Sequence, residues 1–257
     1  MFDLLSGGLS GQAFTVALAV TLFAGFVKGA VGFAMPMILV SAFAIFLPQE
    51  MALAGLILPT LVTNLSQAFR QGVGPAVETA RTYRRFLVAT VVCIAISAPF
   101  ADAIPRVVYL LMLGIPISLF AALQLMGRNL AIQLHHRDRA EWGLGVIGGL
   151  YGGVSGIWGP PLLVLLLSTG ADKMTMVRAQ GVVFLIGAVA LLASHLGTGI
   201  ANPQSLGFST ALSVPALVGL YLGYAVQDRL DQARFRRWTQ GLLVVTGLNM
   251  VRQALFG

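Results

Sequence analysis

The chain contains little charge, and this shortage excludes an ordinary soluble domain. Only 10% of its 257 residues are Asp, Glu, Lys or Arg, while 57% are hydrophobic and the mean hydropathy is +0.87. Soluble globular domains carry roughly 25% charged residues. The apolar runs are continuous, whereas the strands of a porin-type barrel alternate between apolar and polar residues. The composition therefore predicts an all-α integral membrane protein with several spans.

Cysteine and intramembrane carboxylates are also scarce. The single cysteine, Cys93, lies in an apolar run, so it cannot form an internal disulfide or a multi-cysteine metal site. Glu50 and Asp102 stand near the ends of apolar runs, and the sequence holds no P-loop or HExxH pattern. We therefore expect no enzyme, no metal and no cofactor, and neither an ATPase nor a carboxylate-lined cation channel.

Basic residues outnumber acidic ones, 16 to 9, for a net charge of +7. Such an excess can indicate a nucleic-acid partner, but here the arginines concentrate in the short polar stretches 70–85, 128–141 and 227–237. This distribution is typical of the positive-inside rule, by which basic loops stay in the cytoplasm. We expect a lipid bilayer, and no nucleic acid, as the partner.

Two stretches of the chain, 25–36 and 149–160, share a pattern of glycine and proline at a separation of 124 residues. The identical pairs are Gly25 and Gly149, Gly29 and Gly153, Gly32 and Gly156, and Pro36 and Pro160. Glycine and proline set the shape of the backbone. Each stretch also interrupts an apolar run that is longer than the about 20 residues of one span. The pattern predicts matching breaks in two copies of one unit.

Each copy is predicted to be a broken-helix hairpin of two short helices followed by three transmembrane helices. The first copy covers 12–127, the second covers 142–257, and 128–141 is a cytoplasmic connector, so that 1–257 forms one membrane domain. If each broken run enters the membrane and returns, all three basic stretches lie inside and the uncharged loop 197–205 lies outside. The copies are then inverted, with both termini periplasmic. Inverted repeats with broken helices are typical of secondary transporters.

The breaks themselves are predicted to bind an anion. A helix N-terminus carries free N–H donors and partial positive charge, and proline suits its first turn. Residues 29–36 and 153–160 would then form two opposed anion cradles. The candidate residues are Gly29, Gly32, Phe33 and Pro36 in the first break, and Gly153, Ser155, Gly156, Trp158 and Pro160 in the second. The alternative is that these glycines only allow helices to pack closely.

Polar residues inside the apolar runs complete the candidate site. Lys28 could supply a full positive charge to the substrate, since charges within spans are usually functional, or its ammonium could snorkel to the membrane surface. Asn64 and Gln67 could bind the substrate or bridge helices. Arg178 could be a bidentate ligand of an oxyanion or a cytoplasmic anchor. The counterpart of Lys28 in the second copy is the uncharged Gly152, so the site would be asymmetric.

The chain resembles the TauE/SafE family of bacterial membrane transporters, which are described as sulfite or organosulfonate exporters. The resemblance covers essentially the whole chain. It rests on Gly25-x-x-x-Gly29-x-x-Gly32-Phe33-x-x-Pro36, on Gly148-Gly149-x-x-Gly152-Gly153-x-x-Gly156-x-x-Gly159-Pro160-Pro161, and on Met176-Val177-Arg178-Ala179. It implies export of a small sulfur-containing anion across the bacterial inner (plasma) membrane.

The sequence thus predicts a secondary transporter that exports a small anion, such as sulfite or an organosulfonate, by alternating access. A membrane potential that is negative inside would itself favour efflux of a monoanion by about 2.3 kcal/mol per 100 mV. Coupling to the proton gradient or to this potential, and assembly as a homodimer, stay open. The alternatives are a passive anion channel and a non-transporting membrane receptor or scaffold.

Overall fold

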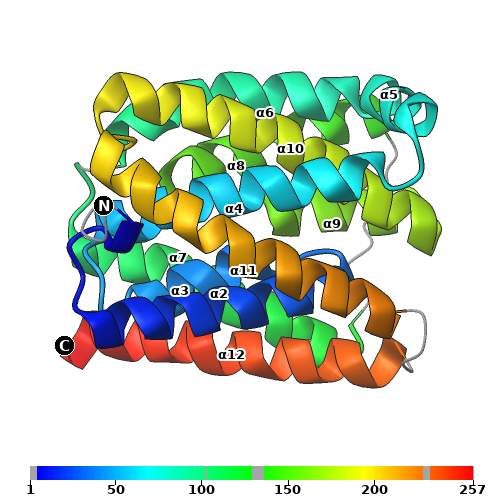
Figure 1. Ribbon diagram of the computed structural model, residues 1–257. Helices are drawn as coiled ribbons and strands as arrows, with labels where there is room; N and C mark the ends of the chain where they lie inside the picture. Colours follow the sequence, from blue (N-terminus) through cyan, green and yellow to red (C-terminus); the bar gives the residue numbers. More distant parts are fainter. Residues whose placement is uncertain (1–4, 102, 129–135, 228–231, 257) are drawn as a thin grey trace.

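The structure, a computed structural model, describes residues 5–101, 103–128, 136–227 and 232–256, and every element named in that part is helical. Figure 1 shows the helices as one elongated bundle. The elements are α2 (Gly11–Val31), α3 (Met35–Phe43), α4 (Gln49–Phe69), α5 (Val73–Thr82), α6 (Arg84–Ser97), η1 (Ala98–Phe100), α7 (Arg106–Leu125), α8 (Arg137–Ser155), α9 (Gly159–Ser168), α10 (Lys173–Thr198), α11 (Pro203–Gln227) and α12 (Gln232–Phe256).

Several of these helices are long and apolar enough to cross a membrane. They are α2, α4, α7, α11 and the part Met174–Gly197 of α10, and the bent pair formed by α5 and α6 with η1 could make a sixth span. A helix needs about 20 residues to cross the hydrocarbon core and satisfies its own backbone hydrogen bonds there. The predicted class, an all-α integral membrane protein with several spans, is confirmed.

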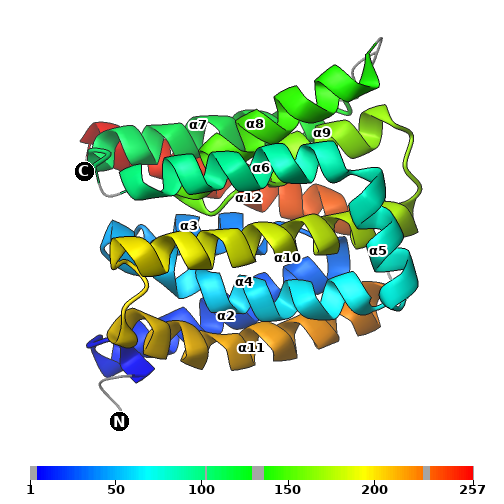
Figure 2. The same cartoon turned by 90° about the horizontal axis from the view of Figure 1, so that it is seen from above.

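The start of α2 and the end of α12 lie at the same end of the bundle, as Figures 1 and 2 show. The turn between α10 and α11 lies at that end too, whereas α5 and the turn between α9 and α10 lie at the opposite end. The basic residues of α5 and of the start of α6, among them Arg81, Arg84 and Arg85, are therefore far from the start of α2 and the end of α12.

Each half of the chain contains a helix that stops and reverses at a glycine. Gly32 ends α2 with a φ of +93°, and Gly156 ends α8 with a φ of +72°. The N–H of each donates to the carbonyl four residues earlier, on Lys28 or Gly152, at 2.7 Å. Only glycine adopts this left-handed backbone without strain. The following helices, α3 and α9, have proline in their first turns, so both predicted breaks are confirmed.

Three boundaries among the first three helices of each half fall at equivalent positions. Equivalent boundaries, 124 residues apart, are the helix ends at Val31 and Ser155, the helix starts at Met35 and Gly159, and the helix starts at Gln49 and Lys173. The halves are interlocked, because α2 of the first half lies along α11 of the second, and α8 lies along α6. In addition, α4 packs on α10 and α7 packs on α12.

Glycines inside α2 and α8 let these interlocked pairs approach closely. A Cβ atom added to Gly29 would lie 2.1 Å from the carbonyl oxygen of Leu220 on α11. One added to Gly153 would lie 2.1 Å from the hydroxyl of Ser97 on α6. Neither contact leaves room for a methyl group. The packing alternative therefore describes these two positions, whereas Gly32 and Gly156 make the breaks.

The structure differs from the sequence-based expectation in two places. The first arm of each hairpin is not short, because α2 has 21 residues and continues through Gly25 and Gly29, and α8 has 19 residues. Helix α2 remains continuous at these glycines because the backbone of α11 packs against them. The stretch 70–85 is not a loop, because it contains α5 and the start of α6. Ala76 and Thr79 are buried, and packing against α10 stabilises this short amphipathic helix.

Two of the predicted basic stretches are described only in part. In the connector 128–141, α8 already begins at Arg137, and 129–135 lie outside the described residues. In the stretch 227–237, α12 begins at Gln232, and 228–231 lie outside the described residues.

Candidate functional site

The two breaks face each other across one small cavity. Its lining comes from both hairpins and from α10, and consists of Phe33, Ala34, Pro36, Met37, Gly156, Ile157, Trp158, Gly159 and Phe184. About 10 Å³ is open to the centre of a water-sized sphere, which is space for about one water molecule. The structure thus brings Phe33, Pro36, Gly156 and Trp158 together in an apolar lining that leaves little free space.

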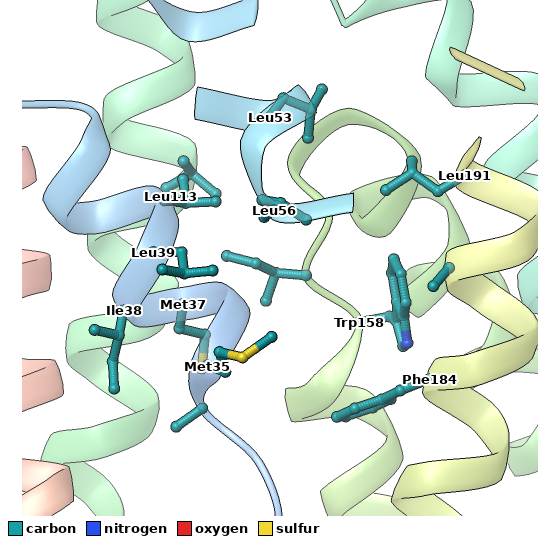
Figure 3. Close-up of a cluster of buried hydrophobic side chains, with 14 of the residues drawn as sticks. Met35, Met37, Ile38, Leu39, Leu53, Leu56, Leu113, Trp158, Phe184 and Leu191 are labelled. Carbon is teal, nitrogen blue, oxygen red and sulfur yellow. The ribbon is translucent and has the colours of Figure 1, made fainter. Parts of the chain in front are cut away.

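Trp158 forms one wall of this cavity. In Figure 3, Met35 and Met37 of α3 lie on one side of the apolar cluster, and Trp158 and Phe184 lie on the other. The two rings of that wall meet edge to face with their centroids 6.0 Å apart. The indole is only 2% exposed, and its N–H has no hydrogen-bond partner in the described part of the chain.

Lys28 lies four residues before the first break and is wholly buried. Its ammonium donates hydrogen bonds to the hydroxyl of Thr63, at 3.0 Å, and to the amide oxygen of Asn64. Snorkelling would bring the ammonium to the membrane surface, and its complete burial contradicts that alternative. The ion pairs found among the described residues join Arg85 to Asp138 and Arg137 to Glu141, and neither includes Lys28. No carboxylate in this part of the chain neutralises Lys28.

Helix α4, which carries Thr63 and Asn64, contains a proline. Pro59 lacks the N–H that would bond to the carbonyl of Gly55 one turn earlier. The hydroxyl of Ser209 on α11 donates to that carbonyl at 3.2 Å. One turn later, Thr63 donates to the carbonyl of Pro59 at 2.6 Å and so keeps its oxygen in place to accept from Lys28.

Two glutamines meet at the first break. The amide nitrogen of Gln67 donates to the carbonyl of Gly32, at 2.9 Å, and to that of Val177 on α10, at 2.8 Å. Gln180 of α10 faces the same glycine, since a Cβ atom at Gly32 would lie 3.0 Å from its amide oxygen. Both side chains are buried, and in the described structure neither amide oxygen has a partner. Gln67 and Gln180 therefore meet at the first break, one helical turn along α4 from Asn64, which binds Lys28.

The second half fills the equivalent space differently. The positions 124 residues after Lys28 and Thr63 are Gly152 and Gly187. The indole of Trp158 lies between them, since a Cβ atom at Gly152 or at Gly187 would come within 2.7 or 2.8 Å of its ring. Trp158 thus occupies the place that the Lys28 side chain has in the first half. The expected asymmetry is present, with a polar first break and an apolar second one.

A comparison with protein families agrees with this architecture. The family model described as "Sulfite exporter TauE/SafE" matches residues 17–250, which include both breaks and the polar residues around Lys28. The chain belongs to the TauE/SafE family. Comparisons with curated proteins and with solved structures gave no significant match. Membership of this exporter family, together with the spanning helices, makes the chain a membrane transporter.

Two further candidate residues of this TauE/SafE protein, Ser155 and Arg178, make hydrogen bonds that the sequence pattern alone does not show. Ser155 holds the backbone of the second break, because its hydroxyl donates to the carbonyl of Tyr151 at 2.7 Å and accepts from the N–H of Ile157 at 3.1 Å. Arg178 lies apart from the cavity lining. It donates to the hydroxyl of Thr79, at 2.8 Å, and to the amide oxygen of Gln71, at 2.5 Å, and so joins α10 to α5 and to the turn before α5.

The start of α10 is fixed outside the apolar part of that helix. The carboxylate of Asp172 accepts from the hydroxyl of Thr175 at 2.6 Å and from the backbone N–H groups of Thr175 and Met174. These hydrogen bonds, chiefly those from Thr175, lower the pKa of the Asp172 carboxyl. This N-terminal cap positions the helix that carries Val177, Gln180 and Phe184.

Proposed function

We propose that this TauE/SafE protein exports a small anion, such as sulfite or an organosulfonate, as a secondary transporter. One observation carries the proposal: the wholly buried Lys28 lies one helical turn from a break, without a carboxylate partner in the described structure. Burying an unpaired charge is unfavourable, and a bound anion would compensate it. The starts of α3 and α9, which lie at the two breaks, would add their partial positive charge.

The transport mechanism that we propose is alternating access between two inverted copies. Three features support it: the repeated helix boundaries, the interlocking of each long hairpin arm with a helix of the other half, and the opposite directions of α4 and α10 in Figures 1 and 2. The cavity holds only about one water molecule, so in this form an anion is excluded. Movement of one hairpin relative to the other would open the site to one side.

The orientation follows from the distribution of basic residues. We propose that the end of the bundle that carries α5 faces the cytoplasm and that both termini are periplasmic, in the bacterial inner membrane. A potential that is negative inside then drives a monoanion outward, with about 2.3 kcal/mol per 100 mV, and no coupling ion is required.

The test is sulfite flux in proteoliposomes that contain the purified chain. We expect efflux that saturates with sulfite concentration and that accelerates when unlabelled sulfite is present on the opposite side. Protein-free liposomes and the larger anion benzenesulfonate are the controls. Flux that never saturates would identify a passive channel, and folded protein without flux would contradict transport of sulfite.

A further inference from the structure

The polar residues at the first break offer two donor groups to a ligand. The Lys28 ammonium can only donate, so Asn64 must present its amide oxygen to it. This fixes the Asn64 amide, whose nitrogen is fully buried and has no partner among the described residues. The ammonium of Lys28 and the amide N–H of Asn64 are therefore donor groups, and both suit the oxygens of an anion.

The same break also presents acceptors. The Gln67 amide is fixed in the same way, because its nitrogen donates to the carbonyls of Gly32 and Val177, which can only accept. Its oxygen is left buried and without a partner, as is the oxygen of Gln180, which lies against Gly32. Buried acceptors without a donor are unfavourable and uncommon in native structures.

A simple oxyanion would satisfy only half of this arrangement. Its oxygens would accept from Lys28 and Asn64, but they would be repelled by the carbonyl oxygens of Gln67 and Gln180. A hydroxyl group on the same ligand would instead donate to those two oxygens. The arrangement therefore matches an anion that carries its own hydrogen-bond donor.

We infer that the preferred substrate of the proposed transport is a small anion that bears a hydroxyl group, and that Gln67 and Gln180 accept its hydrogen bond. Gln180 is then a specificity-determining residue of the site. The inference rests on the proposed function, because the ligand is the transported anion. The inference predicts a preference for an anion with a hydroxyl group. The apolar lining of the cavity, acting alone, would instead favour an anion with an alkyl group.

The test compares two competitors of sulfite efflux in proteoliposomes. These are 2-hydroxyethanesulfonate and 1-propanesulfonate, which have the same charge and nearly the same size, with a hydroxyl in one where the other has a methyl group. We expect the hydroxyl compound to half-inhibit sulfite efflux at a concentration at least about tenfold lower than 1-propanesulfonate does, since the two compounds differ by one buried hydrogen bond. In Gln180→Leu the preference should be lost, while inhibition by 1-propanesulfonate stays unchanged.

A matched control is Gln240→Leu, which removes another buried glutamine on α12, bonded to Gln124 at 2.5 Å and outside the site. This variant should keep the native preference. Gln180→Met serves if Gln180→Leu does not fold. Equal inhibition by both competitors, or stronger inhibition by 1-propanesulfonate, in the native chain would overturn the inference and leave sulfite transport intact. Absence of sulfite flux itself would instead overturn the proposed function.

Discussion

The ammonium of Lys28 lies 3.0 Å from the hydroxyl oxygen of Thr63, and both side chains are wholly buried. The same hydroxyl contacts the sulfur of Met35, the first residue of α3, at 3.9 Å. The lysine on α2 is thus joined through α4 to the helix that follows the break. The position of the Lys28 ammonium is therefore fixed near the break, and the proposed binding of an anion depends on it.

Close packing of α2 on α11 predicts that Gly29→Ala destabilises the protein. The new Cβ atom would lie 2.1 Å from the carbonyl oxygen of Leu220, so the helices must separate. We expect a loss of about 1–3 kcal/mol in the free energy of unfolding, measured in detergent. Gly11→Ala is the matched control, because nothing lies within 4 Å of its Cβ position. Equal stability of the two variants would contradict the packing role.

The left-handed backbone at the breaks predicts that Gly32→Ala and Gly156→Ala are both strained. Each glycine has a positive φ, which a residue with a Cβ atom adopts at a cost of about 1–3 kcal/mol. We expect both variants to unfold at lower temperature than the native chain. Gly159→Ala has no positive φ, and its nearest neighbour lies at 3.4 Å, so it should be nearly neutral. A destabilised Gly159→Ala beside unaffected Gly32→Ala and Gly156→Ala would reject this explanation.

Trp158 is predicted to limit the size of the substrate. Trp158→Ala removes the wall between Gly152 and Gly187 and enlarges the cavity, at about 3–5 kcal/mol of stability. We expect the flux of benzenesulfonate relative to sulfite to rise by about tenfold or more. Trp142→Ala, at a side chain that is 45% exposed, should leave this ratio unchanged. An unchanged ratio in Trp158→Ala would place the size limit elsewhere.

The proposed orientation predicts opposite accessibility at the two ends of the bundle. Arg81 on α5 and Gln204 at the start of α11 are both exposed, and their segments lie at opposite ends. In cells, a membrane-impermeant thiol reagent should label Gln204→Cys directly and Arg81→Cys only after permeabilisation. The native Cys93 is buried and should stay unlabelled. Labelling of both variants from the same side would contradict the inverted arrangement.

The sequence was sufficient to predict the membrane class and the two breaks. Glycine followed by proline, at Gly32 and Pro36 and again at Gly156 and Pro160, predicts the end of one helix and the start of the next. This effect comes from the backbone of these residues and does not depend on packing partners. It was not sufficient to separate these glycines from Gly29 and the other packing glycines. That distinction depends on whether another helix lies against the position, and only the folded structure shows it.

The polar part of the site could be predicted only in part. Lys28, Asn64 and Gln67 stand out because polar residues are rare in apolar runs. The inward position of Gln180 and the insertion of Trp158 between two glycines depend on how α10 packs on α4 and α8. The role of Arg178 depends on α5, to which it binds, and the polar sequence of 70–85 is interpreted as a loop rather than as a helix.

The most direct test of the central claim is sulfite flux through Lys28→Met compared with the native chain. Methionine has a similar length and removes the buried charge, so the variant should fold at least as stably as the native protein. If Lys28 binds the anion, saturable flux should fall by about 100-fold or more, because the anion loses its charge partner. Arg252→Met, at an exposed arginine of α12, should keep native flux. Native flux in folded Lys28→Met would contradict the account.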